Sequence, residues 1–164
     1  MNRIGTFLKE LRHEKATTRK MLERIPNDKF DWKPHPKSMS IRQLAGHIAE
    51  LFAWAAMALT TDELDFASGK YKPPVVNTND DLLQLMEKSF NVSEAQLVPE
   101  NEDKLDGTWT LRTGDTIHSA TSREEVIRMS LNQIVHHRAQ LGVYLRLLDI
   151  PIPGSYGPSA DEGF

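Results

Sequence analysis

Residues 122–148 read SREEVIRMSLNQIVHHRAQLGVYLRLL, and this stretch decides the fold. It opens with a capping box, in which Ser122 can accept from the backbone amide of Glu125 while the Glu125 side chain reaches back. The one glycine inside it, Gly142, costs only about 1 kcal/mol relative to alanine in a helix interior. No proline interrupts the pattern before Pro151. The stretch therefore predicts one long helix that ends near Leu148.

Three further amphipathic segments precede this helix, at residues 2–25, 40–59 and 78–97. Pro26 ends the first segment, because proline lacks an amide hydrogen and restricts the residue before it. A capping box at Ser40 and Gln43 opens the second segment. Apolar residues recur in these segments mostly at spacings of three and four, which predicts one buried stripe on each helix. These residues are Ile4, Phe7, Leu8, Leu11, Leu22 and Ile25, then Ile41, Leu44, Ile48, Leu51, Phe52, Ala55 and Leu59, then Leu82, Leu83, Leu85, Met86, Phe90, Val92 and Leu97.

Two stretches do not show a helical pattern. Residues 105–117 fit either a short hairpin or an ordered loop. Residues 151–158, PIPGSYGP, cannot be helical, so we expect an extended tail lying over the rest of the protein. Four amphipathic helices with a long connection before the last one predict an all-α four-helix bundle, formed as a single domain by residues 1–164.

The composition excludes several classes of function. The net charge is −3 and no basic run follows a phosphate backbone, which argues against nucleic acid as a partner. The chain has no cysteine, so any thiol chemistry needs a thiol from a substrate. No apolar run is long enough to span a membrane, and the first residues do not resemble a signal peptide. We therefore expect a cytoplasmic protein with no membrane partner.

Histidines on two of the predicted helices suggest a metal site. His47 borders the apolar stripe of the second helix, three residues after Leu44 and four before Leu51. Gln133 and His137 are four residues apart, so they share one face of the last helix. His136 is rotated by about 100° from His137 and should face elsewhere. We expect His47, Gln133 and His137 to converge and to bind any divalent ion.

A simpler interpretation remains open for these residues. A buried histidine on a helix often only donates to a backbone carbonyl or to a carboxylate, and the spacing alone is a weak signal for metal. The other three histidines are weaker candidates for metal ligands. His13 lies beside Glu14 on what reads as a charged helix face, His35 lies between prolines, and His118 lies in a polar segment, so we expect them at the surface.

The chain resembles the DinB-like family of damage-inducible four-helix metalloproteins. The resemblance rests on residues 132–148, NQIVHHRAQLGVYLRLL, and on the tail that follows. Residues 22–26, 32–40 and 44–49 agree with it as well. It implies a metal triad made of one histidine on the second helix and a His-x-x-x-His pair on the last. His47 and His137 match this triad, whereas Gln133 stands in place of the middle histidine.

This departure leaves the function open. A glutamine carbonyl is a weaker ligand than imidazole for zinc or nickel, so the site binds such an ion weakly or is empty. The resemblance implies a thiol S-transferase, related to the bacillithiol and mycothiol S-transferases, with a small-molecule thiol and an electrophile as partners. The alternatives are a non-catalytic, stress-related binding protein with a degraded site and a metal-dependent hydrolase. The resemblance also implies a homodimer. A second apolar face of the last helix, formed by Ile127, Leu131 and Val135, agrees with this expectation.

Overall fold

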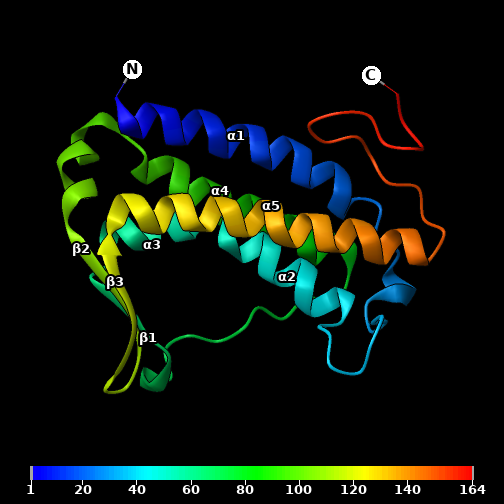
Figure 1. Ribbon diagram of the computed structural model, residues 1–164, viewed down its shortest axis with the longest axis horizontal. Coiled ribbons are helices and arrows are strands. Elements are labelled where there is room, and N and C mark those ends of the chain that lie inside the picture. The colour runs from blue at the N-terminus through cyan, green and yellow to red at the C-terminus, as the bar shows by residue number, and fades with distance from the viewer. Residues whose placement is uncertain (1, 164) are drawn as a thin grey trace.

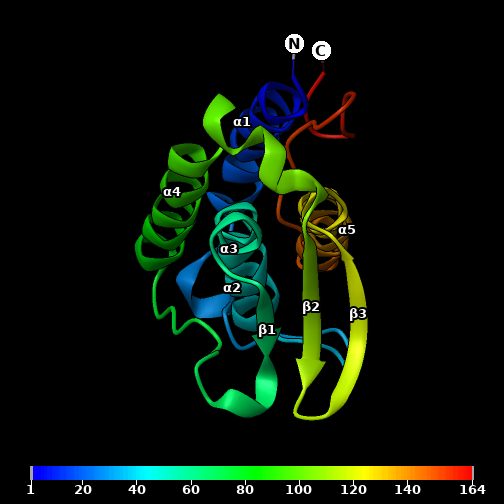
Figure 2. The same ribbon diagram turned by 90° about the vertical axis from the view of Figure 1, so that its left-hand side faces the viewer.

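The computed structural model describes residues 2–163, and α-helices occupy four positions around one apolar core (Figures 1 and 2). One position is shared by two short helices that follow each other, and each of these packs against α4 and α5. The α-helices are α1 (Arg3–Leu22), α2 (Ile41–Leu51), α3 (Trp54–Thr60), α4 (Asn79–Gln96) and α5 (Arg123–Leu147). The remaining elements are the 3₁₀ segments η1 (Asn27–Lys29), η2 (Phe66–Ser68) and η3 (Pro99–Asp106) and the strands β1 (Glu63–Asp65), β2 (Thr108–Thr113) and β3 (Thr116–Ser122).

The helix starts agree closely with the sequence. The capping boxes predicted at Ser40 and Ser122 are both present, and a third forms between Thr78 and Asp81 at the start of α4. At α1, the Asn2 side chain accepts from the amide of Gly5. Each cap satisfies backbone amides that a helix otherwise leaves unpaired, and this is why the starting residues could be predicted from local sequence.

The second helix does not run unbroken from Ser40 to Leu59 as predicted. It ends at Leu51, and α3 begins at Trp54 after a tight turn. The break leaves the amide of Ala56 without its helical partner, and the buried Ser93 hydroxyl of α4 accepts it at 3.0 Å. Apolar periodicity continues through the turn, so the sequence pattern does not mark the break. The contact with a distant helix satisfies the amide that the break leaves unpaired.

The protein is mostly helical but not all-α, which corrects the predicted fold class. Three strands form a small sheet in the order β1-β2-β3, with β1 parallel to β2 and β2 antiparallel to β3. The hairpin alternative for residues 105–117 is therefore correct, and Gly114 adopts the left-handed φ of 55° that its tight turn requires. The buried Trp109 joins the sheet to the helices, because its indole nitrogen donates to the hydroxyl of Thr61 at 3.1 Å.

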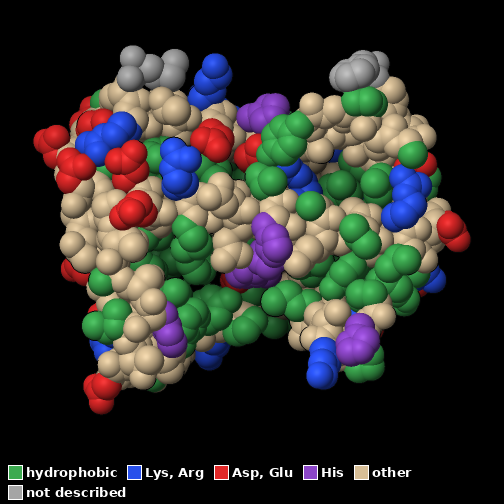
Figure 3. Space-filling model, viewed as in Figure 1, with side chains coloured by type: hydrophobic (Ala, Val, Ile, Leu, Met, Phe, Trp, Pro, Cys, Tyr) green, Lys and Arg blue, Asp and Glu red, His purple; other side chains and the backbone are tan. Residues whose placement is uncertain are grey.

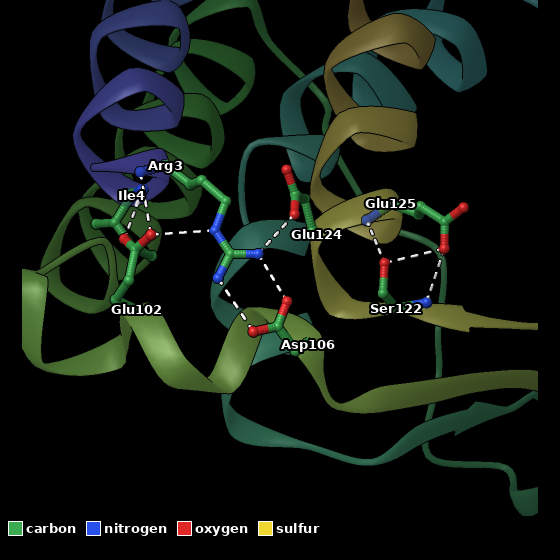
Figure 4. A network of polar contacts seen from close by, with 7 residues as sticks. All are labelled: Arg3, Ile4, Glu102, Asp106, Ser122, Glu124 and Glu125. Carbon is green, nitrogen blue, oxygen red and sulfur yellow. Dashed lines mark hydrogen bonds and ion pairs between the residues drawn. The ribbon is translucent and has the colours of Figure 1, made fainter. Parts of the chain in front are cut away.

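A charge network closes the end of the bundle where α1 and α5 begin (Figure 4). The Arg3 guanidinium donates to Glu102 and Asp106 of η3 and to Glu124 of α5. Glu102 also accepts the backbone amides of Arg3 and Ile4 at the start of α1, each at 3.1 Å. These backbone amides, with Arg3 itself, hold the pKa of Glu102 below its usual value. Through these contacts η3, which is part of the long connection before α5, is held to the N-terminal ends of α1 and α5.

The C-terminal tail lies on the bundle, as predicted. The Tyr156 hydroxyl donates to Glu14 of α1 at 2.6 Å and accepts from Arg138 of α5 at 3.0 Å. Glu14 was expected on a charged face, but only 3% of it is exposed. Its carboxylate is buried because Arg138, which is equally buried, forms an ion pair with it. The sequence gives no local sign of this pair, since its partners are 124 residues apart.

The apolar residues that suggested a dimer face belong largely to the core. Ile127 and Leu131 are buried within the bundle, and Val135 is half-buried. They therefore do not offer a free surface to a second copy, and the homodimer stays a prediction without this support. Among residues 2–163, no helix is long and apolar enough to cross a membrane.

Candidate metal centre

Two of the three predicted ligands meet between α2 and α5. The ring centroids of His47 and His137 lie 5.0 Å apart, with the ring planes at 69°. Both side chains are half-buried, so each ring lies at the edge of the core. Figure 3 shows histidine side chains grouped near the centre of one face of the molecule, beside apolar side chains. The pairing follows from helix geometry, because each histidine lies beside the apolar stripe that packs α2 against α5.

The proton of the His47 ring is fixed by a carboxylate. Nδ1 of His47 lies 2.7 Å from Oε1 of Glu50, one turn further along α2. The hydroxyl of Tyr71 donates to the same oxygen, also at 2.7 Å. An ionised carboxylate only accepts hydrogen bonds, so Nδ1 of His47 carries the proton. The lone pair of Nε2 is then left available for a ligand.

A glutamine has the same effect on the other ring. Nδ1 of His137 lies 2.9 Å from Oε1 of Gln140, and the Gln140 amide nitrogen lies 3.1 Å from Nε2 of His136. The amide oxygen accepts, so His137 also carries its proton on Nδ1. Burial lowers the pKa of His137, the hydrogen bond to Gln140 opposes this, and nearby His47 and His136 lower it further. Burial and the two neighbouring histidines favour a neutral His137 ring, and the hydrogen bond to Gln140 leaves Nε2 free; a neutral ring is the form that binds metals.

Gln133 lies one turn before His137 on α5 and is half-buried. Within residues 2–163 its side chain makes no hydrogen bond, so the amide oxygen is available on the face that His137 shares. Its convergence with the two histidines remains a prediction. His136 is exposed, and its ring centroid lies 4.9 Å from that of His137. The Gln140 side chain contacts both rings. His13, His35 and His118 are exposed, as expected.

The described residues offer few donors for a divalent ion. In the part of the chain from residue 2 to residue 163, no group of three or more histidine, cysteine, aspartate or glutamate side chains could hold a metal. Two imidazole nitrogens and one amide oxygen are therefore the donors that His47, His137 and Gln133 could provide. Imidazole suits zinc and nickel, whereas a neutral amide oxygen adds little for either ion. Such a set leaves positions for water or substrate.

A cavity of about 250 Å³ opens beside His47. Met39, Pro73 and Pro74 form its apolar walls, and Glu50 and Tyr71 supply polar groups next to the histidine. A larger cavity, of about 420 Å³, lies between α5 and the tail but contains none of the histidines. We place the candidate site at the smaller cavity, because binding sites combine apolar walls with a few convergent polar groups.

Comparison with known sequences settles the family. The sequence profile of the DinB family matches residues 1–163. The chain belongs to the DinB family. No curated protein matches it at the sequence level.

Solved DinB-like proteins share the fold at low sequence identity. One from Exiguobacterium sibiricum is 21% identical with a TM-score of 0.71, covering 94% of this chain and 97% of that one. One from Bacillus cereus is 18% identical with a TM-score of 0.69, covering 92% and 95%. A mycothiol-dependent maleylpyruvate isomerase is 16% identical with a TM-score of 0.60; the match covers 85% of this chain but only 60% of the isomerase. These similarities establish the fold of the DinB-family chain.

The sequence prediction missed the polar residues around the histidines. Glu50 follows His47 by three residues, a spacing that places both on one face of α2, so a local signal existed. Gln140 follows His137 by the same three residues, so the same local signal existed there. Tyr71 lies in a segment without regular structure after η2, and nothing in the sequence connects it to Glu50.

Proposed function

We propose that this DinB-family protein is a metal-dependent thiol S-transferase in which His47, His137 and Gln133 hold a divalent ion, zinc or nickel. One observation carries the proposal: imidazoles from two helices meet with both Nδ1 atoms hydrogen-bonded, and among residues 2–163 neither Nε2 atom has a hydrogen-bond partner. A cavity large enough for part of a small molecule lies beside His47. The similarity to a mycothiol-dependent isomerase supports thiol chemistry, although the thiol dependence is a property of that protein.

In this proposal the residues of the site have different roles. His47 and His137 supply neutral nitrogen donors, and Met39, Pro73 and Pro74 offer apolar contact to the organic part of a substrate. The chain has no cysteine, so the sulfur nucleophile is an external low-molecular-weight thiol. A bound divalent ion would act as a Lewis acid that lowers the pKa of that thiol.

The transfer itself is a substitution at the electrophile. The thiol loses its proton to solvent, its sulfur forms a bond to carbon, and the leaving group departs with the electron pair of the broken bond. The half-buried position of both histidines keeps this reaction partly shielded from water.

Gln133 favours a second proposal, in which the protein is a non-catalytic binding protein with a degraded metal site. Among residues 2–163 the site lacks a third histidine or carboxylate ligand. In this case the DinB fold and its cavity would bind a small molecule without transferring a thiol. The two proposals differ in whether the protein holds a metal and consumes a thiol.

The test uses protein purified without an affinity tag. Its metal content would be measured first, followed by consumption of mycothiol or another small thiol in the presence of an activated aryl halide. We expect stoichiometric zinc or nickel after reconstitution and metal-dependent thiol loss that disappears in His47→Ala. Metal binding without thiol loss would contradict the transferase, and the absence of both would favour the binding protein. Failure to bind metal would contradict both the metal site and the transferase.

A further inference from the structure

Glu50 contacts Nδ1 of the His47 ring and Tyr71 contacts Glu50, and the proposed function leaves both residues without a role. We propose that Glu50 and Tyr71 are positioning residues that fix the tautomer and orientation of the His47 ring. The inference rests on the proposed function in one respect, that Nε2 of His47 is the binding atom. It is otherwise independent of the ion and of the substrate.

The environment of Glu50 supports this role. Only 14% of its side chain is exposed, and within residues 2–163 no lysine or arginine forms an ion pair with it. Arg42 lines the same cavity, but its guanidinium is engaged by Asp31 and by the carbonyl of Val76. The carboxylate is therefore satisfied by hydrogen bonds from His47 and Tyr71. Burying a carboxylate that has no lysine or arginine partner costs free energy unless hydrogen bonds satisfy its oxygens.

Tyr71 is itself held from several directions. Its ring packs edge-on against Phe66, with centroids 5.5 Å apart. Further along the same segment, Val76 is buried against α2, and Pro74 lies within about 3.5 Å of where a Cβ of Gly46 would be. The segment is thus seated closely on α2, which brings the Tyr71 hydroxyl to Glu50. Burial, followed by the hydrogen bond to Glu50, raises the pKa of Tyr71, so the hydroxyl remains a donor.

The arrangement forms a chain from Tyr71 through Glu50 to His47. Both donors meet on one carboxylate oxygen, so the Tyr71 hydroxyl limits how that oxygen can move relative to His47. Carboxylate partners of this kind orient ligating histidines, and their loss typically weakens metal affinity by 10–100-fold. Three residues from two segments thereby determine where the Nε2 lone pair points.

The first readout needs no metal. Nitrogen NMR of the metal-free protein, about two pH units above the ordinary histidine pKa of about 6.5, would report which nitrogen of His47 carries the proton. We expect the Nδ1-protonated form in the wild type and a shift toward the Nε2-protonated form in Glu50→Ala. Glu50→Gln keeps an accepting oxygen and should retain much of the wild-type signature. Tyr71→Phe should give a smaller shift.

The second readout is zinc affinity by titration calorimetry. We expect Glu50→Ala to weaken binding by about 10–100-fold, Glu50→Gln to recover part of the loss, and Tyr71→Phe to lose less. Glu10→Ala, which removes an exposed glutamate of α1, is the matched control and should change nothing. Circular dichroism would confirm that each variant is folded.

The outcomes separate the two proposals. An unchanged His47 tautomer in a folded Glu50→Ala variant would overturn the positioning role. An altered tautomer in that variant, in a protein that binds no zinc even as wild type, would overturn the proposed function and leave the positioning role of Glu50 supported.

Discussion

Two neighbouring residues of α5, His137 and Arg138, lead to two polar clusters of opposite character. Arg138 is 3% exposed, and its guanidinium donates to Glu14, Thr18 and Tyr156. The ring of His137 is half-buried and makes one side-chain hydrogen bond, to Gln140, while its other nitrogen is free among the described residues. The helical rotation of about 100° per residue separates the two clusters onto different faces.

The difference shows which polar clusters belong to structure and which can bind a ligand. In the Arg138 cluster the guanidinium, the Glu14 carboxylate and the Tyr156 hydroxyl are hydrogen-bonded to one another. Its hydrogen bonds join α1, α5 and the tail. The His137 cluster keeps imidazole lone pairs unpaired beside a cavity, at a cost that binding can offset. The first cluster should therefore control stability and the second should control affinity.

The largest expected effect is on stability, in Glu14→Ala. Removing one partner of a buried ion pair leaves Arg138 as an uncompensated buried charge, which costs about 3–5 kcal/mol. Urea unfolding followed by circular dichroism would measure the loss. Glu10→Ala, on the exposed face of the same helix, should stay within about 0.5 kcal/mol of wild type. A loss below about 1 kcal/mol in Glu14→Ala would mean that the pair does not hold the bundle together.

The next effect is on metal affinity, in His47→Ala and His137→Ala. Each removes a nitrogen donor, so zinc affinity should fall by more than the 10–100-fold typical of an outer partner. Their stability should change much less than that of Glu14→Ala, because both rings are half-buried. His136→Ala, which alters an exposed neighbouring ring, should lower affinity only slightly. If His136→Ala abolished binding and His137→Ala did not, the assignment of faces on α5 would be wrong.

A gain of affinity is expected for Gln133→His. An imidazole replaces a weak amide oxygen on the face that His137 shares, so zinc should bind at least about tenfold more tightly, or about 1.4 kcal/mol. Asn132→His introduces the same ring one residue earlier, at an exposed position, and serves as the control. Equal affinities in the two variants would show that Gln133 does not face the site.

The smallest effect concerns the tail, in Tyr156→Phe. This change removes a hydroxyl that donates to Glu14 and accepts from Arg138, at a cost of about 1–2 kcal/mol. Hydrogen exchange should show faster exchange in residues 151–162, with zinc affinity unchanged. A change in zinc affinity without faster exchange in the tail would mean that the two clusters are not independent.

The parts of this protein that could be predicted are those encoded locally. The capping boxes at Ser40 and Ser122 marked two helix starts, and helical spacing placed His47 and His137 on facing stripes. The missed features depend on contacts between distant segments. Ser93 makes the break between α2 and α3 tolerable, Arg138 accounts for the burial of Glu14, and β1 forms only because β2 lies beside it.

The central claim is that His47, Gln133 and His137 surround one divalent ion. X-ray absorption at the zinc edge of the reconstituted protein tests it most directly, because it counts imidazole ligands. We predict two imidazole nitrogens at about 2.0–2.1 Å from the zinc in the wild type. The number of imidazole ligands should fall to one in His137→Ala and rise to three in Gln133→His. An imidazole count that is the same in the wild type and in both variants would contradict it.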